Sequence, residues 1–176
     1  MKKKNIIHFI FLIFLVVGTI YVIKNHQTNK LQHSEGNIFG TVFSIEYEYK
    51  TALDSAILEK LNEVDSSLSM FNKQSIVSKI NSGESDSTDL MFRNVFRLAQ
   101  NVAEDTDGAY DITVAPLVNA WGFGFKNGED VSAQKIDSIK TFVGYKKVTL
   151  EGSKLKKADH RTMLDFSSVA KGYALD

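Results

Sequence analysis

The stretch Asp107–Phe125, with the sequence DGAYDITVAPLVNAWGFGF, places the strongest local constraints on the fold of this chain. It contains the only proline and the only tryptophan of the chain, together with a glycine-spaced run of aromatic residues. The pair Asp107-Gly108 predicts a turn, and Pro116 predicts the start of a short helix because proline suits the first helical turn. So many special residues in one segment indicate a surface shaped around a flat, polar ligand.

A second stretch with unusual polar chemistry is Leu164–Asp176, with the sequence LDFSSVAKGYALD. Ser167 and Ser168 follow a predicted strand and would cap a helix that begins at Val169. The free backbone N–H groups at the start of a helix favour anionic groups such as phosphate. The segment therefore predicts a phosphate-binding loop.

Two charged side chains flank this predicted helix start. Lys171 would place a positive charge next to a phosphate oxygen, and Asp165 would hold a ligand hydroxyl, an amine or Mg²⁺. The simpler alternative is that the serines only cap the helix and that Asp165 and Lys171 form a solvated pair. Spacing alone leaves both interpretations open.

The mid-chain stretch offers a carboxylate and an aromatic wall. Asp111 follows Tyr110 at the mouth of an apolar element, where a carboxylate needs a partner, and the ring N–H of a bound heterocycle would serve. Trp121, Phe123 and Phe125 would stack on a planar ring, because the intervening glycines allow close approach. The alternative is that these rings pack in the core and that Asp111 is a structural cap.

Composition limits the classes of function. The chain has 176 residues, of which 43% are hydrophobic and 24% charged, as expected for about one globular domain. The formal net charge is +0, so we expect no nucleic-acid partner. Cysteine is absent, which excludes disulfides, thiolate metal sites and cysteine nucleophiles.

The N-terminus has the composition of a targeting segment. Lys2–Lys4 precede the apolar run Ile6–Ile23, and no small-x-small cleavage pattern follows. We therefore predict an uncleaved membrane anchor over residues 1–24 in preference to a cleaved signal peptide, with the lysines cytoplasmic and the remainder outside the inner membrane. Residues 25–37 are polar and predict a tether, and residues 38–176 form the predicted domain.

Hydrophobic periodicity after the tether alternates between helical and strand patterns. The predicted helices are Ala52–Leu68, Ser75–Ile80, Thr88–Asp105 with Ser87 or Thr88 as its cap, a short one from Ala115, Ser132–Lys140, and one from Val169. The predicted strands are Ile38–Tyr49, Lys147–Leu150 and Thr162–Asp165. This predicts the α+β class, a mixed sheet with packed helices, and a cleft where Asp111, Trp121 and the Asp165–Lys171 loop converge. The last helix has no stop signal, so we expect a fragment that is incomplete at its C-terminus.

Four blocks of the chain, in the same order, resemble the ApbE family of FAD:protein FMN transferases. The similarity extends over Phe39–Asp176, roughly the N-terminal half of the family's length. The blocks are GTVFSIEY, SSLSMFNKQSIVSKIN, DGAYDITVAPLVNAWGFG and LDFSSVAKGYALD.

This resemblance implies specific site residues. Ala109, Tyr110 and Asp111 match positions that contact the flavin nucleotide in the family. Asp165 and Lys171 match further contacts to FAD.

Three other positions follow from the same resemblance. Ser168 matches a magnesium-coordinating position. The methionine usual before Gly-Thr is Phe39 here, and the tyrosine usual in the second block is Phe71, which keeps the ring but lacks the hydroxyl. We expect both phenylalanines to pack against the ring system of FAD. The resemblance assigns no catalytic residue.

The resemblance also implies an activity. A membrane-anchored protein would use FAD and Mg²⁺ to attach FMN to a Ser or Thr hydroxyl of a target flavoprotein in a membrane redox complex, releasing AMP. We expect the isolated chain to attach no FMN, because the family's second cluster of metal ligands would follow Asp176.

Two other classes of function stay open. A non-catalytic, membrane-tethered FAD-binding protein would bind flavin and attach none to a partner. An extracytoplasmic interaction domain would bind no flavin at all.

Overall fold

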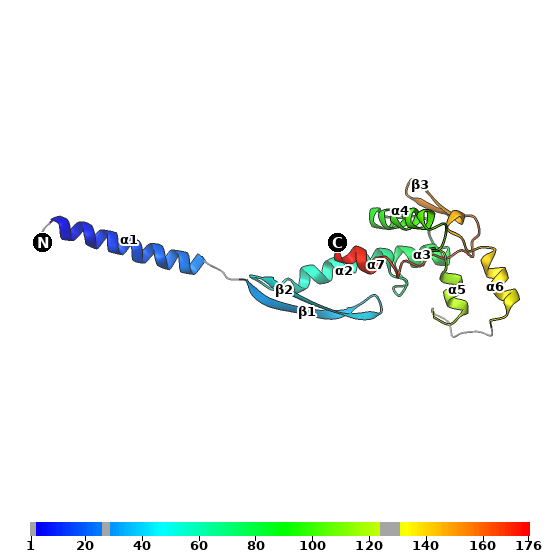
Figure 1. Ribbon diagram of the computed structural model, residues 1–176, viewed down its shortest axis with the longest axis horizontal. Coiled ribbons are helices and arrows are strands. Elements are labelled where there is room, and N and C mark those ends of the chain that lie inside the picture. Colours follow the sequence, from blue (N-terminus) through cyan, green and yellow to red (C-terminus); the bar gives the residue numbers. More distant parts are fainter. Residues whose placement is uncertain (1–2, 26–28, 124–130) are drawn as a thin grey trace. The chain divides into compact units, whose positions relative to one another are not determined.

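The computed structural model describes residues 3–25, 29–123 and 131–176 (Figure 1). The chain divides into two compact units. The first comprises Met1–Gly36 and Phe43–Asp54, and the second comprises Asn37–Val42 and Ser55–Asp176. The family-like blocks lie mostly in the second unit, which holds the candidate site.

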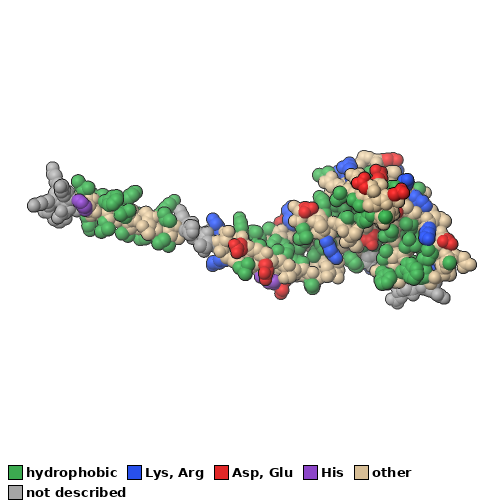
Figure 2. All heavy atoms as spheres, in the orientation of Figure 1, with side chains coloured by type: hydrophobic (Ala, Val, Ile, Leu, Met, Phe, Trp, Pro, Cys, Tyr) green, Lys and Arg blue, Asp and Glu red, His purple; other side chains and the backbone are tan. Residues whose placement is uncertain are grey.

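The first unit begins with a long apolar helix, α1 (Lys3–Asn25). Its segment Ile6–Lys24 has a mean hydropathy of 2.8 and is long and apolar enough to cross a membrane. Hydrophobic side chains surround this helix on the visible face (Figure 2). N-terminal signal sequences share this length and composition, so the helix by itself agrees with an anchor or a signal.

A two-stranded sheet follows, formed by β1 (Lys30–Ile38) and β2 (Thr41–Tyr49). Phe39 and Gly40 join the strands with φ angles of 54° and 71°, so the chain reverses there. The predicted single strand Ile38–Tyr49 is therefore wrong at its start. Residues 30–37 of the predicted tether lie in β1, where backbone pairing with β2 orders a polar segment that has no hydrophobic pattern of its own.

The second unit contains the remaining helices and a second small sheet. The helices are α2 (Asp54–Leu68, whose first residue belongs to the first unit), α3 (Ile76–Ser82), α4 (Leu90–Asp105), α5 (Ala115–Ala120), α6 (Ala133–Lys140), the 3-10 helix Tyr145–Lys147, and α7 (Ala170–Leu175). Strands β3 (Val148–Glu151) and β4 (Lys154–Lys157) pair antiparallel, from Val148 with Lys157 to Glu151 with Lys154. The α+β class is confirmed, with two separate two-stranded sheets among the described residues.

Capping residues explain where several helices begin and end. The Ser75 side chain accepts from Ser78 N at the start of α3, and Gly83 ends that helix in the left-handed conformation. Ser132 caps α6 as predicted. The cap of α4 is Asp89, which accepts from Phe92 N, and not Ser87 or Thr88 as predicted. All three candidates are common N-cap residues, so sequence alone did not separate them.

The C-terminal stretch differs from the prediction in two ways. The predicted strand Thr162–Asp165 forms only an isolated parallel bridge, between Met163 and Val114, while β4 was not predicted. The predicted serine cap of α7 is also wrong. Val169 is its N-cap and makes no side-chain capping bond, and Ser167 N instead donates to Asp165 Oδ1 at 2.7 Å. A local turn at Asp165 thus replaces the cap.

The main core lies among α2, α3, α4 and the segment that leads into α7. Phe92 of α4 is fully buried, and its ring meets the Phe166 ring edge to face, with centroids 5.0 Å apart. Ile112 and Leu164 are buried in the same cluster. A separate small cluster of Ala120, Ile139 and Phe142 joins α5 and α6. The main core therefore fixes both stretches that the sequence singled out.

Candidate functional site

The mid-chain stretch and the C-terminal stretch lie side by side, as the ligand hypothesis required. Asp165 N donates to Ile112 O at 2.7 Å, directly after the bridge between Met163 and Val114. Beyond this pairing, the Tyr110 hydroxyl lies 3.0 Å from Ser168 Oγ. Two segments more than fifty residues apart in the chain thus present their polar side chains at one place.

A cavity of about 120 Å³ lies next to the C-terminal loop. Three predicted cofactor residues from separate stretches line it, namely Phe39, Phe71 and Lys171. The other lining residues are Leu68, Ser69, Met70, Ser167 and Ala170. Sequence reasoning missed Ser69 and Met70, although they lie where the helical pattern breaks after Leu68.

Phe71 is held in place by the turn of the β1–β2 hairpin. A Cβ atom added at Gly40 would lie 3.0 Å from Phe71 Cγ, so the ring packs closely on the glycine backbone. The Phe71 side chain is nonetheless 59% exposed. An exposed aromatic ring at the rim of a cavity is suited to stacking on a planar ligand.

Lys171 supplies a positive charge at this cavity. Its side chain is exposed, and among the described residues it has no ion-pair partner. The Asp165 carboxylate accepts from Ser167 N, and no ion pair joins it to Lys171 within the described ranges. The alternative of a solvated Asp165–Lys171 pair is therefore wrong in this structure.

Asp111 has a structural environment. Its Oδ1 accepts from Thr113 N and from Thr113 Oγ1, both at 2.7 Å, and its Oδ2 accepts from Tyr145 N at 2.8 Å. Thr113 Oγ1 in turn accepts from Gly144 N at 2.7 Å. The carboxylate thus connects two loops by hydrogen bonds. This supports the alternative that Asp111 has a structural role. Its contact with flavin stays a prediction.

The remaining predicted positions are exposed. Ala109 lies on the surface, and its N–H donates to Thr106 O at 3.1 Å. Ser168 is exposed, and its hydroxyl forms a hydrogen bond with the Tyr110 hydroxyl. Within residues 3–25, 29–123 and 131–176, no group of three His, Asp or Glu side chains could hold a metal ion. The roles of Ala109 and Ser168 stay predictions.

Trp121 and Phe123 are not core residues, since 58% and 85% of their surface is exposed. Phe125 lies outside the described residues. Trp121 follows α5, which packs against α6 in the small separate cluster, and neither Trp121 nor Asp111 lines the 120 Å³ cavity. The cavity lies between the hairpin turn, Phe71 and the C-terminal loop, and the predicted cleft at Asp111 and Trp121 stays a prediction.

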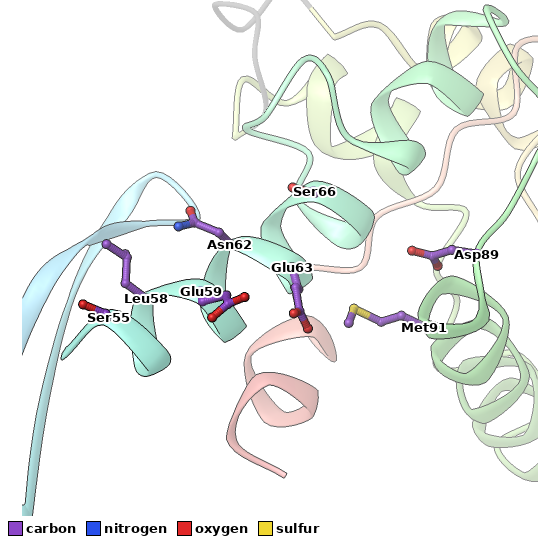
Figure 3. A pocket seen from close by; sticks show the side chains of 8 residues that line it. All are labelled: Ser55, Leu58, Glu59, Asn62, Glu63, Ser66, Asp89 and Met91. Atoms are coloured by element: carbon purple, nitrogen blue, oxygen red, sulfur yellow. The ribbon is translucent and has the colours of Figure 1, made fainter. Parts of the chain in front are cut away.

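A larger hollow of about 850 Å³ lies along α2 and the start of α4 (Figure 3). Met91 extends from α4 toward Glu63 of α2. Two of the acidic side chains that line the hollow already have partners, because Glu63 pairs with Lys60 at 2.9 Å and Asp89 accepts from Ser67 Oγ at 3.0 Å. No predicted site residue lines this hollow, so it is the weaker candidate.

The fold and cavity define an α+β protein whose aromatic-walled site lies beside a lysine-bearing loop. Residues 39–176 match the model of the ApbE family, and the chain belongs to that family. A relative from Vibrio cholerae serotype O1, "FAD:protein FMN transferase", is 32% identical over 155 residues, covering 82% of this chain and 46% of the relative. A relative of the same name from Escherichia coli K12 is 30% identical over 167 residues, covering 87% and 47%.

Solved structures agree with this assignment. "Flavin Transferase ApbE from Vibrio cholerae" superposes with a TM-score of 0.76 at 30% identity, covering 84% of this chain and 52% of that one. The apo form of the Pseudomonas stutzeri flavinyl transferase ApbE gives a TM-score of 0.75 at 30% identity, covering 85% and 53%. The chain therefore spans about half the length of the relatives that it matches.

Proposed function

We propose that the protein transfers the FMN part of FAD to a Ser or Thr hydroxyl of a target flavoprotein and releases AMP. The names of its relatives support flavin transfer. The observation that carries the proposal for this chain is that Phe39, Phe71 and Lys171 line one cavity, although they come from three separate stretches.

The cavity residues suit a flavin dinucleotide in their chemistry. The rings of Phe39 and Phe71 would pack on the flat isoalloxazine system, and the Lys171 ammonium would attract a phosphate oxygen. In the reaction, the acceptor hydroxyl oxygen forms a bond to the FMN phosphorus, and the bond from that phosphorus to the bridging oxygen breaks. AMP leaves with the bridging oxygen, and the acceptor loses its hydroxyl proton. Binding and orientation of FAD are the tasks we assign to these residues.

Magnesium fits this site only in part. The Ser168 hydroxyl is an oxygen donor of the kind that Mg²⁺ accepts, and Asp165 lies three residues before it. Since Mg²⁺ takes six oxygen ligands and commonly binds through substrate phosphates and water, we propose Ser168 as one protein ligand. When bound, the ion would offset the negative charge of the diphosphate.

We propose that residues 1–24 anchor the protein in the cytoplasmic membrane and that residues 38–176 belong to the flavin transferase domain outside it. The apolar span Ile6–Lys24 and the lysines before it support this orientation. The target would then be a flavoprotein of a membrane redox complex on the same side.

Co-expression with a flavoprotein acceptor tests the activity. A host that attaches no covalent flavin would carry the protein and the acceptor, and denaturing gels of its membranes would be scanned for flavin fluorescence. We expect fluorescence on the acceptor band when the acceptor is co-expressed with a protein of the full length of the relatives, with AMP released in the purified reaction, and no labelling by residues 1–176 alone. FAD that copurifies with the protein while the acceptor stays unlabelled would instead establish the non-catalytic FAD-binding alternative.

A pair of lysine variants tests the cavity. Lys171→Ala is expected to weaken FAD binding by roughly tenfold to a hundredfold, since a contact with a charged group contributes about 1.5–3 kcal/mol. Lys156→Ala, at an exposed lysine of β4, is the matched control and should leave binding unchanged. Equal affinities of the two variants would contradict the placement of FAD at this cavity.

A further inference from the structure

We propose that Asn81 is a positioning residue. Its side chain fixes the backbone at Leu164, directly before the loop that carries Asp165, Ser168 and Lys171. The inference about ligand binding rests on the proposed function, whereas the inference about the loop does not. Asn81 is the last residue of the block SSLSMFNKQSIVSKIN, and unlike Phe71 of the same block it does not line the 120 Å³ cavity.

The Asn81 amide pairs with a backbone segment as a neighbouring strand would. Its Nδ2 donates to Leu164 O at 2.8 Å, and Leu164 N donates to its Oδ1 at 2.8 Å. The two residues are 83 positions apart in the chain. A side-chain amide carries the same donor and acceptor as a peptide group, so one asparagine satisfies both polar groups of Leu164.

The opposite edge of the same segment is held by backbone. Asp165 N donates to Ile112 O at 2.7 Å, and Met163 bridges to Val114. The Leu164 side chain is fully buried in the main core. Residues 163–165 are therefore held on both sides, and the chain emerges to the surface at Ser167 with its path already set.

Asn81 lies on a helix whose two ends are held by capping hydrogen bonds. It lies in the last turn of α3, between the Ser75 cap and Gly83, whose N–H donates to Ile80 O. Lys157 Nζ also donates to Ile80 O, at 3.0 Å. Because the helix end is tied down, the Asn81 amide holds Leu164 in a fixed place.

The residue type matters for this role. Aspartate at position 81 would keep the acceptor for Leu164 N and lose the donor to Leu164 O. Alanine would leave both buried backbone groups without this partner. Asn81 does not line the 120 Å³ cavity, but it lines a hollow of about 400 Å³ that shares Met70 and Phe71 with that cavity. Hydrogen exchange at the loop amides is therefore the direct readout of the positioning role.

Amide hydrogen exchange without ligand tests the positioning role. In Asn81→Ala, the exchange of the Asp165, Ser167 and Ala170 amides is expected to quicken by about tenfold or more, and less in Asn81→Asp. Thr88→Val is the control, because it removes a comparable bond, from Thr88 Oγ1 to Ser153 O at 2.8 Å, away from this loop. Unchanged exchange at the three amides in Asn81→Asp and Asn81→Ala would overturn the proposal.

Affinity for FAD is the second readout. We expect Asn81→Ala to weaken FAD binding by about tenfold, and Thr88→Val to leave it unchanged at a similar melting temperature. If Asn81→Ala does not fold, Asn81→Asp carries both measurements. A wild-type chain that binds no FAD would count against the proposed function alone, because the exchange result does not depend on ligand. Faster exchange with unchanged affinity would overturn the link from the loop to the site.

Discussion

At the scale of single residues, one side chain can either bind a ligand or form hydrogen bonds within its own chain. The folded geometry determines which of the two it does. The sequence placed Asp111 at the mouth of an apolar element and correctly predicted that its carboxylate needs a partner. It did not identify the partner, because Tyr145 is far away in the chain and reaches Asp111 only after the loops fold together.

Asp111→Ala is expected to lower the free energy of unfolding by about 2–3 kcal/mol, because three donors lose a charged acceptor. Chemical denaturation measures this change. Asp105→Ala, at the exposed end of α4, is the control and should stay within about 0.5 kcal/mol of the wild type. Similar losses in both variants would contradict the structural role.

Acid stability is expected to depend on Asp159. Hydrogen bonds from the Arg161 side chain, at 2.6 and 3.0 Å, hold the pKa of this carboxyl well below its ordinary value. A lowered pKa in the folded state gives stability that is present above about pH 4 and lost as the pH falls. Between about pH 5 and pH 2, the wild type should lose more stability than Asp159→Asn in denaturant titrations. Parallel pH profiles would refute this assignment.

At the scale of elements, helices followed from the sequence better than strands. The stripes of α2 and α4 and the cap of α6 are local patterns, so their positions were predicted closely. β1 and β4 consist largely of polar or charged residues and depend on pairing with a neighbouring strand. No local pattern marked them, because partners supply the stabilisation.

The start of α4 offers a direct test of one local error. Asp89→Ala should lower the free energy of unfolding by about 1–2 kcal/mol, since it removes the acceptor of Phe92 N at 2.7 Å and of Ser67 Oγ. Ser87→Ala, which alters the cap expected from sequence, should change it by less than about 0.5 kcal/mol. Thermal melts of the two variants show which residue caps α4. A larger loss of stability in Ser87→Ala than in Asp89→Ala would support the predicted serine cap.

At the scale of the whole molecule, the apolar N-terminal helix and the candidate site have different origins. The apolar span of α1 follows from composition alone, whereas the cavity exists only because a hairpin turn, the end of α2 and the C-terminal loop meet. Substitutions in α1 are therefore expected to change the interaction with the lipid bilayer and to leave the cavity unchanged.

Charges in the middle of α1 are expected to release the protein from membranes. Leu12→Lys combined with Val16→Lys places two charges near the centre of Ile6–Lys24, at a cost of about 2.5–3.5 kcal/mol each. The protein should then move from the carbonate-resistant membrane fraction to the soluble fraction. The matched double alanine variant should stay in the membrane. Retention of the lysine variant would contradict the anchor.

The apolar N-terminal span, the main amphipathic helices and the family-like blocks follow from local patterns, since each depends on residues close together in the chain. No local pattern predicts that Phe39, Phe71 and Lys171 share a cavity, that Asp111 accepts a hydrogen bond from Tyr145 N, or that Asn81 holds Leu164. These contacts join distant segments, and burial and hydrogen-bond satisfaction in the folded core select them.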